Sequence, residues 1–222
     1  MSLWIKICAN TSLEDALVAA EAGADAVGFV FASSPRRVTA SEVAAITAKL
    51  PAAVEKIGVF VDAALEEIVS TVQASGLTGV QLHFDAAREL PAELHERLGA
   101  ELRIIRVMHF GAERAAGIGE YDRDTHVDAL LVDSQTAKAA GGTGMAFDWT
   151  VARTTLFQKV EARKRLIAAG GLNAENVAEA IAVLRPWGVD TVSGVEAAPG
   201  RKDAAKVREF VARSRVAHRG MK

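Results

Sequence analysis

Eight short apolar runs, each of strand length, alternate with helical patterns along the 222 residues of the chain. The predicted strands are 4–8, 26–31, 56–61, 79–83, 103–108, 129–132, 166–169 and 189–192. The segments between them repeat apolar residues at helical spacing, as Leu65, Ile68, Val69 and Val72 do. Eight strand–helix units in a chain of this length indicate an α/β protein, folded as a single (β/α)8 TIM barrel domain over 1–222.

A doubly wound open sheet is the structural alternative, because it also alternates strands with helices. Such a sheet usually has fewer strands and carries its glycine signature after the first strand. Here Ala9, Asn10 and Thr11 follow the first strand, and the glycine clusters follow the sixth, seventh and eighth strands. This order favours the closed barrel, in which the loops after strands seven and eight commonly build a phosphate site.

The ends of some helices can be predicted from their residue types. Thr39 and Glu42 have the spacing of a capping box, which predicts a helix directly after Thr39. The helix expected over 112–121 is the weakest, because glycines interrupt it. The last helix is expected over about 204–213, and the polar, basic residues 214–222 are expected to form a flexible tail.

Three glycine clusters next to apolar runs predict an anion site. Glycine lets backbone N–H groups approach a ligand closely, and several such amides aimed at one point bind phosphate. The predicted phosphate-binding residues are Gly142, Thr143, Gly144, Gly170, Gly171, Ser193 and Gly194. A pair of glycines can also be a plain helix cap or turn, but three clusters at strand ends favour a phosphorylated substrate.

Charge and cysteine content narrow the partners and the compartment. The formal net charge is −2, so no overall field attracts nucleic acid or an acidic membrane. The first residues show no signal-peptide pattern, and the apolar runs are too short to span a bilayer. The single cysteine allows no internal disulfide, which fits a reducing compartment. We expect a cytoplasmic protein that acts on a small phosphorylated molecule, binds no nucleic acid and no membrane, and is a monomer or a homodimer.

Two side chains at predicted strand ends could transfer protons. Cys8 ends the first strand, although a lone cysteine in an apolar strand is more often a small core residue. Asp133 follows an apolar strand, where a charge is costly unless it is paired, and it could equally be a solvated carboxylate at a turn. A thiol and a carboxylate on opposite sides of a barrel mouth could act as base and acid on a sugar phosphate.

Other polar residues near strand ends have both a structural and a functional interpretation. His83 could make an ordinary hydrogen bond or take part in the chemistry. Arg36 and Arg37 could be solvated loop charges, or one of them could bind a carboxylate. No set of histidines, cysteines and carboxylates has the spacing of metal ligands, so no metal site is expected.

Eight short sequence motifs are distributed over nearly the whole chain. They are Lys-Ile-Cys (6–8), Gly-Phe-Val-Phe (28–31), Ser-Pro-Arg (34–36), Val-Gln-Leu-His (80–83), Val-Asp-Ser (132–134), Gly-Gly-Thr-Gly (141–144), Ala-Gly-Gly-Leu-Asn (169–173) and Ser-Gly-Val-Glu (193–196). As a set they resemble the motifs of the phosphoribosylanthranilate isomerase family.

The resemblance implies a (β/α)8 barrel that uses neither a metal nor an organic cofactor. It implies an Amadori rearrangement of N-(5-phosphoribosyl)anthranilate to 1-(2-carboxyphenylamino)-1-deoxyribulose 5-phosphate, in tryptophan biosynthesis. By this resemblance Cys8 is the general base and Asp133 the general acid. Arg36 is expected to bind the anthranilate carboxylate, and Gln81 and His83 to line the pocket. The glycine clusters are expected to bind the phosphate.

Two positions depart from the family pattern, which has glycine where this chain has Ala9 and Phe84. Alanine is tolerated at the first unless the backbone there needs a positive φ, and Phe84 could narrow the pocket. The alternatives are therefore a related sugar-phosphate isomerase with a shifted substrate and a catalytically weakened paralogue that binds a phosphorylated ligand. A Schiff-base aldolase is disfavoured, since no lysine lies in predicted strands four to eight.

Overall fold

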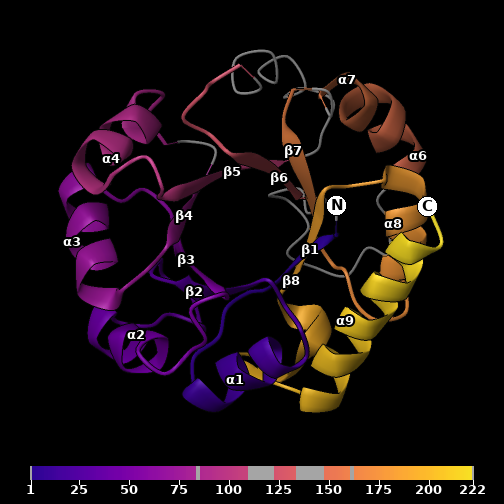
Figure 1. Ribbon diagram of the computed structural model, residues 1–222, viewed down its shortest axis with the longest axis horizontal. Helices are drawn as coiled ribbons and strands as arrows, with labels where there is room; N and C mark the ends of the chain where they lie inside the picture. Colours follow the sequence, from indigo (N-terminus) through magenta and orange to yellow (C-terminus); the bar gives the residue numbers. More distant parts are fainter. Residues whose placement is uncertain (1, 84–85, 110–122, 134–147, 161–162, 222) are drawn as a thin grey trace.

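The computed structural model describes residues 2–83, 86–109, 123–133, 148–160 and 163–221. Eight parallel strands form a closed barrel in sequence order, and β8 pairs back to β1 (Figure 1). They are β1 Trp4–Ile7, β2 Ala26–Val30, β3 Glu55–Phe60, β4 Gly79–Leu82, β5 Arg103–His109, β6 Ala129–Asp133, β7 Arg165–Ala169 and β8 Gly188–Thr191. Each strand begins and ends within one residue of its predicted position, so the barrel prediction is confirmed and the open sheet is excluded.

Helices surround the barrel and cover the outer side of the strands (Figure 1). They are α1 Leu13–Glu21, α2 Ala40–Thr47, α3 Leu65–Ser75, α4 Leu90–Leu98, α6 Trp149–Ala152, α7 Gln158–Val160, α8 Val177–Leu184 and α9 Ala204–Arg219, with a π-helical turn at Arg153–Phe157 between α6 and α7. The helix predicted over 112–121 lies outside the described residues. No helix within the described ranges is long and apolar enough to cross a membrane.

The capping box predicted for α2 is present. Thr39 Oγ1 accepts a hydrogen bond from the Glu42 backbone N–H, and the Glu42 carboxylate accepts one from the Thr39 backbone N–H. Two backbone donors at the helix start are thereby satisfied by side chains. The sequence therefore sets where α2 begins.

The predicted end of the last helix was wrong. α9 continues to Arg219, so residues 214–219 belong to this helix rather than to the tail expected over 214–222. Ser214 is fully buried on it, and the Arg215 guanidinium donates to the backbone oxygens of Leu3 and Gly23 and forms an ion pair with Asp25 at 2.8 Å. A polar and basic composition does not reveal these contacts, because their partners lie near the other end of the chain.

The apolar side chains form two layers, one inside the barrel and one between the strands and the helices. The inner layer consists of Trp4, Ala26, Ile57, Ile105, Val107, Ala129, Leu131, Ile167 and Ala169. Trp4 stacks on Trp187 with ring centroids 5.2 Å apart, which closes the end of the barrel where the strands begin. Since side chains alternate along a strand, positions 6 and 8 of β1 and 133 of β6 also face inward, beyond this apolar layer.

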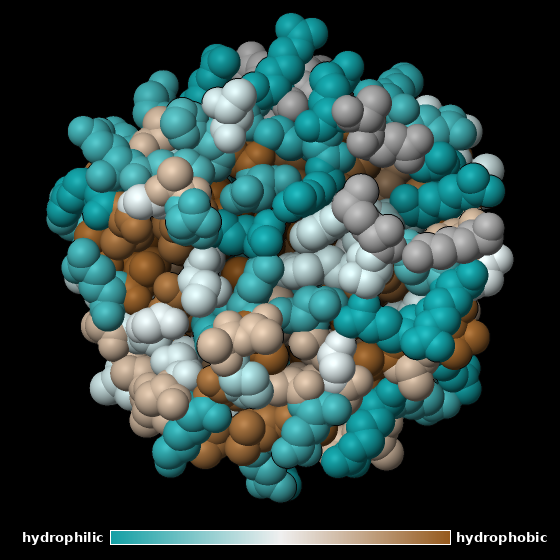
Figure 2. All heavy atoms as spheres, viewed as in Figure 1, coloured by the Kyte–Doolittle hydropathy of each residue, from teal (hydrophilic) through white to brown (hydrophobic). Residues whose placement is uncertain are grey.

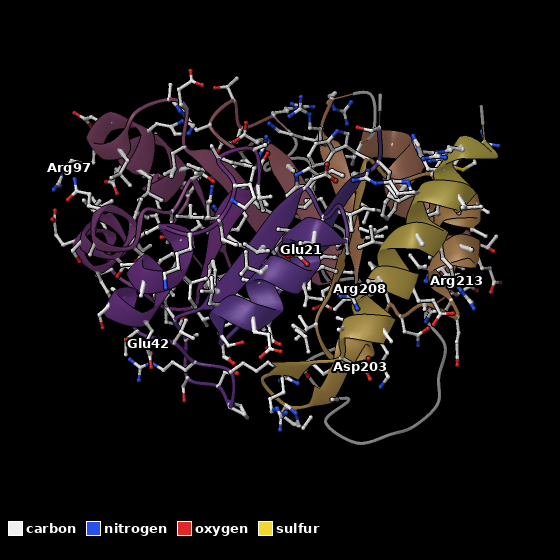
Figure 3. The ribbon with its side chains drawn as sticks, turned by 60° about the horizontal axis from the view of Figure 1, so that its bottom comes forward. Glu21, Glu42, Arg97, Asp203, Arg208 and Arg213 are labelled. Atoms are coloured by element: carbon white, nitrogen blue, oxygen red, sulfur yellow. The ribbon has the colours of Figure 1, made fainter. Side chains whose placement is uncertain are left out.

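Charged side chains lie on the outer faces of the helices. Figure 3 shows Arg97 and Arg213 on helices towards the two sides of the molecule. Arg213 pairs with Glu209 one turn earlier at 2.6 Å, and both side chains are about half exposed. Such exposed pairs contribute little to stability, roughly 0–1 kcal/mol each, so the barrel depends on its two apolar layers.

Candidate active site

Cys8 and Asp133 occupy the same end of the barrel. Cys8 follows β1, and its backbone N–H donates to the Thr191 oxygen of β8 at 2.9 Å. Asp133 is the last residue of β6. On the closed barrel only β7 and β8 separate β6 from β1 in one direction. Both residues are at the carboxyl ends of parallel strands, where the active sites of such barrels lie.

A buried polar cluster lies directly below the thiol. Lys6 is fully buried, and its Nζ donates to Asp190 Oδ1 at 2.9 Å and to Gln81 Oε1 at 3.0 Å. Gln81, predicted to line the pocket, therefore does face the barrel interior. Lys6 and Asp190 were not predicted. Their signal was a charged residue in the middle of an otherwise apolar strand, where it has to be paired inside the fold.

Burial and neighbouring charges set the ionisation of this cluster. Burial raises the pKa of the Cys8 thiol, and Asp190 adds to the rise, while Lys6 and Lys202 work to lower it. Burial also raises the pKa of the Asp190 carboxyl against the effect of Lys6, and the charge of Asp133 raises it further. Burial works to lower the pKa of Lys6, but Asp190 and Cys8 outweigh burial, and the net shift is upward. Asp190 is thus near enough to influence the thiol, and Asp133 is near enough to influence Asp190.

Arg36, which was predicted to bind the substrate carboxylate, forms an ion pair with a carboxylate of the chain itself. Its Nε and Nη2 donate to the two carboxylate oxygens of Glu196 at 2.8 and 2.6 Å, a bidentate pair, and Lys202 Nζ approaches the same carboxylate at 3.4 Å. The hydrogen bond to Glu196 raises the pKa of the Arg36 guanidinium. Burial alone would raise the pKa of Glu196, but Arg36, Lys202 and the Gly200 N–H together lower it. Glu196 therefore fixes where the guanidinium lies, and Glu196 and Lys202 were not predicted site residues.

The hairpin that carries Glu196 and Lys202 was not predicted either. It consists of β9 Glu196–Ala198 and β10 Arg201–Lys202, which pair antiparallel after β8. Gly200 has a φ of +79° at its turn. The strands are too short for their side chains to show a period, so the pattern of apolar residues did not reveal them.

The loops after β7 and β8 contact each other, as the phosphate-site prediction requires. Gly170 and Gly171 have φ of +90° and +71°, which glycine adopts without strain. Gly194 lies in a 3₁₀ turn at Ser193–Val195, and a Cβ there would be 2.0 Å from the Leu172 oxygen. Only glycine fits this approach. The three remaining residues of the prediction, Gly142, Thr143 and Gly144, lie outside the described residues.

His83 and Ala9 lie next to the cluster. His83 follows β4 two positions after the inward-facing Gln81, and its backbone N–H donates to the Phe60 oxygen at 3.2 Å. Ala9 has a φ of +61°, the conformation for which glycine is the default residue. An alanine there costs roughly 1–2 kcal/mol. The other departure from the family pattern, Phe84, lies outside the described residues.

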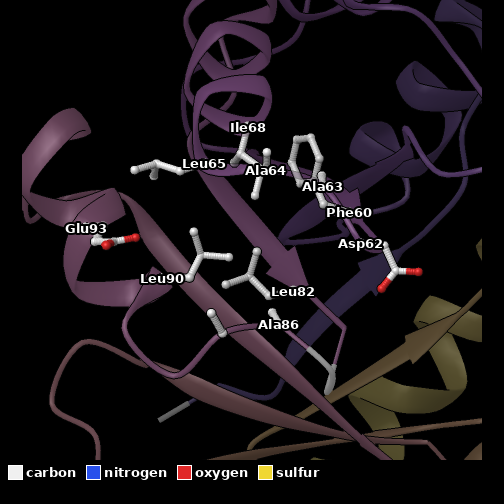
Figure 4. Close-up of a pocket in the computed structure, with 11 residues that line it drawn as sticks. Phe60, Asp62, Ala63, Ala64, Leu65, Ile68, Leu82, Ala86, Leu90 and Glu93 are labelled. Carbon is white, nitrogen blue, oxygen red and sulfur yellow. The ribbon is translucent and has the colours of Figure 1, made fainter.

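An apolar cavity of about 430 Å³ lies elsewhere, on the outer side of the barrel between α3 and α4. Figure 4 shows Phe60, Leu65 and Leu90 around it, with Asp62 at its rim. Figure 2 shows apolar side chains at the surface on the side where these helices lie. Phe60 and Leu82 belong to the layer outside the strands, so this cavity is separate from the cluster at Cys8. Within the described part of the chain, no group of three or more metal-ligating side chains is present.

Comparisons with known proteins point to one family. Residues 5–213 match the family described as N-(5'phosphoribosyl)anthranilate (PRA) isomerase. The chain is 44% identical over 208 residues to N-(5'-phosphoribosyl)anthranilate isomerase of Pelobacter propionicus, covering 93% of each chain.

Two solved structures extend the likeness to the fold. One is a phosphoribosyl anthranilate isomerase in complex with reduced 1-(o-carboxyphenylamino)-1-deoxyribulose 5-phosphate, with 34% identity, a TM-score of 0.79, and coverage of 96% of this chain and 98% of that one. The other contains monomers generated from the dimeric isomerase of Thermotoga maritima, with 34% identity, a TM-score of 0.78 and the same coverage.

Proposed function

The chain belongs to the N-(5'-phosphoribosyl)anthranilate isomerase family, and on that premise we propose which of its residues perform each step. The enzyme converts N-(5-phosphoribosyl)anthranilate to 1-(2-carboxyphenylamino)-1-deoxyribulose 5-phosphate, an Amadori rearrangement in tryptophan biosynthesis. This reaction opens a furanose ring and then moves a proton away from C2. It therefore needs one acid and one base that reach the same sugar.

Asp133 acts as the general acid and Cys8 as the general base. Asp133 gives its proton to the ring oxygen, the bond between that oxygen and C1 breaks, and the anilino nitrogen forms a Schiff base with C1. The Cys8 thiolate then takes the proton from C2, the electron pair of that C–H bond forms a C1–C2 double bond, and the π pair of the Schiff base moves to the nitrogen. The resulting enolamine tautomerises to the ketone. The observation that supports these roles is that both residues face inward at the carboxyl ends of β1 and β6.

The remaining residues bind the two ends of the substrate. The loops of Gly170, Gly171, Ser193 and Gly194 bind the phosphate, together with the segment of Gly142, Thr143 and Gly144. The contact between the β7 and β8 loops supports this assignment, because it brings the backbones of both loops together at Gly194 and Leu172. Arg36, held by Glu196, binds the anthranilate carboxylate, and Gln81 and His83 line the wall between the two ends.

The test removes each proton-transfer group in turn. Cys8→Ala and Asp133→Ala are each expected to lower kcat by about 10²–10⁴-fold, the contribution of a positioned acid or base. Turnover is followed by the loss of fluorescence of the anthranilate adduct. Asp128→Ala is the matched control, since Asp128 lies at the other end of β6 and accepts from the Ile104 N–H. Near-normal turnover in a folded Cys8 or Asp133 variant would refute the role given to that residue.

We further propose a homodimer in the cytoplasm. The dimeric state of the Thermotoga maritima relative supports the first part, and the single cysteine supports the second. Sedimentation velocity of the purified protein tests the dimer, and a monomer at all concentrations would contradict it. Fractionation of cells that express the protein tests the location.

A further inference from the structure

Lys6 has no part in the proton transfers described above, yet it is placed next to the base. Lys6 lies on β1 and Cys8 follows the strand directly, two residues later, so both side chains point into the barrel. Lys6 has an exposed fraction of 0%, and lysine is almost never buried to this extent unless it is paired. Something inside the barrel therefore has to hold its charge.

The contacts of Lys6 leave one donor for the thiol. An ammonium group has three N–H donors. Asp190 Oδ1 and Gln81 Oε1 accept two of them at 2.9 and 3.0 Å, and the charge of Lys6 acts to lower the pKa of the Cys8 thiol. The carboxylate oxygen of Asp190 comes from β8 and the amide oxygen of Gln81 comes from β4, on different sides of the barrel. The two oxygens therefore fix the ammonium group between them.

Gly28 shows how closely the two side chains lie. A Cβ at Gly28 would be 2.5 Å from the Cys8 sulfur and 3.0 Å from Lys6 Cε. The sulfur and the end of the lysine side chain therefore border one small space on the β2 side. No side chain separates the ammonium from the thiol at this point, because position 28 has none.

Other charged groups also influence the ionisation of the thiol, but each is less well placed than Lys6 to favour the thiolate. Arg36 and Lys202 both contact the Glu196 carboxylate, so they share their charge with it. Asp190 acts against a thiolate but lies beyond the ammonium on β8, and Asp133 lies at the end of β6. The positive end of the Lys6–Asp190 pair is thus directed towards Cys8.

We propose that Lys6 is a positioning residue that favours the thiolate form of the Cys8 side chain against the effect of burial, and that Asp190 and Gln81 hold Lys6 in place for this purpose. The proposal rests on the proposed role of Cys8 as general base. Burial alone would favour the neutral thiol, which cannot remove a proton from C2. The lysine offsets that effect without touching the substrate.

The direct test measures thiolate formation without catalysis. Cys8 is the single cysteine of the chain, so alkylation by iodoacetamide reports on it alone. In Lys6→Met, the pH midpoint of the alkylation rate is expected to move upward by about 1–3 units, since a nearby opposite charge shifts a titration by that amount. The matched control is Lys56→Met, which removes another buried strand lysine whose Nζ bonds the Pro51 oxygen far from the thiol. Its midpoint is expected to stay where it is in the unaltered protein.

The catalytic test separates this role from a structural one. At neutral pH, kcat of Lys6→Met is expected to fall about tenfold or more, with KM within about twofold, because Lys6 does not contact the substrate. Raising the pH is expected to restore kcat, since it supplies the thiolate that the lysine no longer favours. A purely structural defect would not be rescued by alkali.

The single variant leaves Asp190 buried without its partner, which can prevent folding. The double variant Lys6→Met/Asp190→Asn removes both charges and is expected to show a smaller upward shift of the midpoint, because Asp190 itself acts to raise the pKa of the thiol and Lys6 has the larger effect. An unchanged alkylation midpoint in either folded variant would overturn the proposal. A shifted midpoint with no change in the pH dependence of kcat would uphold the link from Lys6 to the thiol and refute the thiol as base.

Discussion

The substitution Gly28→Ala tests most directly the geometry at the Cys8 thiol, the proposed base. The added methyl carbon would be 2.5 Å from the Cys8 sulfur, 3.0 Å from Lys6 Cε and 3.1 Å from Cys8 Cα. Non-bonded carbon atoms are best separated by about 3.5–4.0 Å, so the sulfur has to move by about 1 Å. A displacement of that size at a reacting group costs roughly 10²-fold in rate. We therefore expect kcat/KM of Gly28→Ala to fall by about 10²-fold.

The same change is expected to cost stability, because methyl groups added to a packed core destabilise by about 1–3 kcal/mol. Gly58→Ala is the matched control for this effect. Its methyl carbon would be 2.7 Å from Leu77 Cδ1 and 2.8 Å from Phe60 Cε2, in the layer outside the strands. Both variants are expected to lose similar stability in urea denaturation. Only Gly28→Ala is expected to lose activity.

The refuting result follows from this pairing. If Gly28→Ala folds and keeps kcat/KM within about threefold, the sulfur position in the structure does not govern the rate. If both variants lose activity to the same extent, general destabilisation rather than displacement of the thiol explains the loss.

Three further predictions concern charge and backbone strain. Arg185→Gly is expected to stabilise the protein by about 0.5–1 kcal/mol in urea denaturation, because Arg185 ends α8 with a φ of +49°, where glycine is unstrained. With Cys8 as the proposed base, kcat is expected to rise through the alkaline range, since burial raises the pKa of the Cys8 thiol and the thiolate becomes the main form only above it; a pH–rate profile that is flat above neutrality would contradict this. Glu196→Gln is expected to raise KM and to lower stability by about 1–3 kcal/mol, because Arg36 and Lys202 lose the carboxylate that pairs them; steady-state kinetics and thermal unfolding measure the two effects.

Much of the fold could be predicted because its signals are local. Each strand is a short apolar run, and each inward position follows from strict alternation along it. The start of α2 follows from Thr39 and Glu42, which are three residues apart. Gly170, Gly171 and Gly194 marked the loops after β7 and β8, because their backbone geometry needs glycine.

The candidate site was predicted only in part. Cys8 and Asp133 stand out as polar residues at strand ends, and their roles, like that of Gln81 as a pocket residue, stay predictions; the structure shows that Gln81 accepts a hydrogen bond from Lys6 inside the barrel. In the sequence Glu196 is visible only as part of a motif. In the structure its carboxylate accepts from Arg36, which is 160 residues away in the chain. From the sequence, a positive φ at Ala9 is only a condition under which alanine would be strained. The structure shows that this condition holds, with a φ of +61°.

The order of strands and helices, the inward positions and the glycine turns were thus determined by the sequence itself, since propensity and periodicity act over a few residues. The pairing of Lys6 with Asp190 was decided only by the tertiary structure. These residues are 184 positions apart, and they meet because the barrel closes β8 onto β1 with Lys6 opposite Asp190. The extension of α9 to Arg219 was decided in the same way, by the bonds of Arg215 to the first residues of the chain. A charged residue in a buried strand indicates that it has a partner inside the fold, but only closure of the barrel determines which residue that partner is.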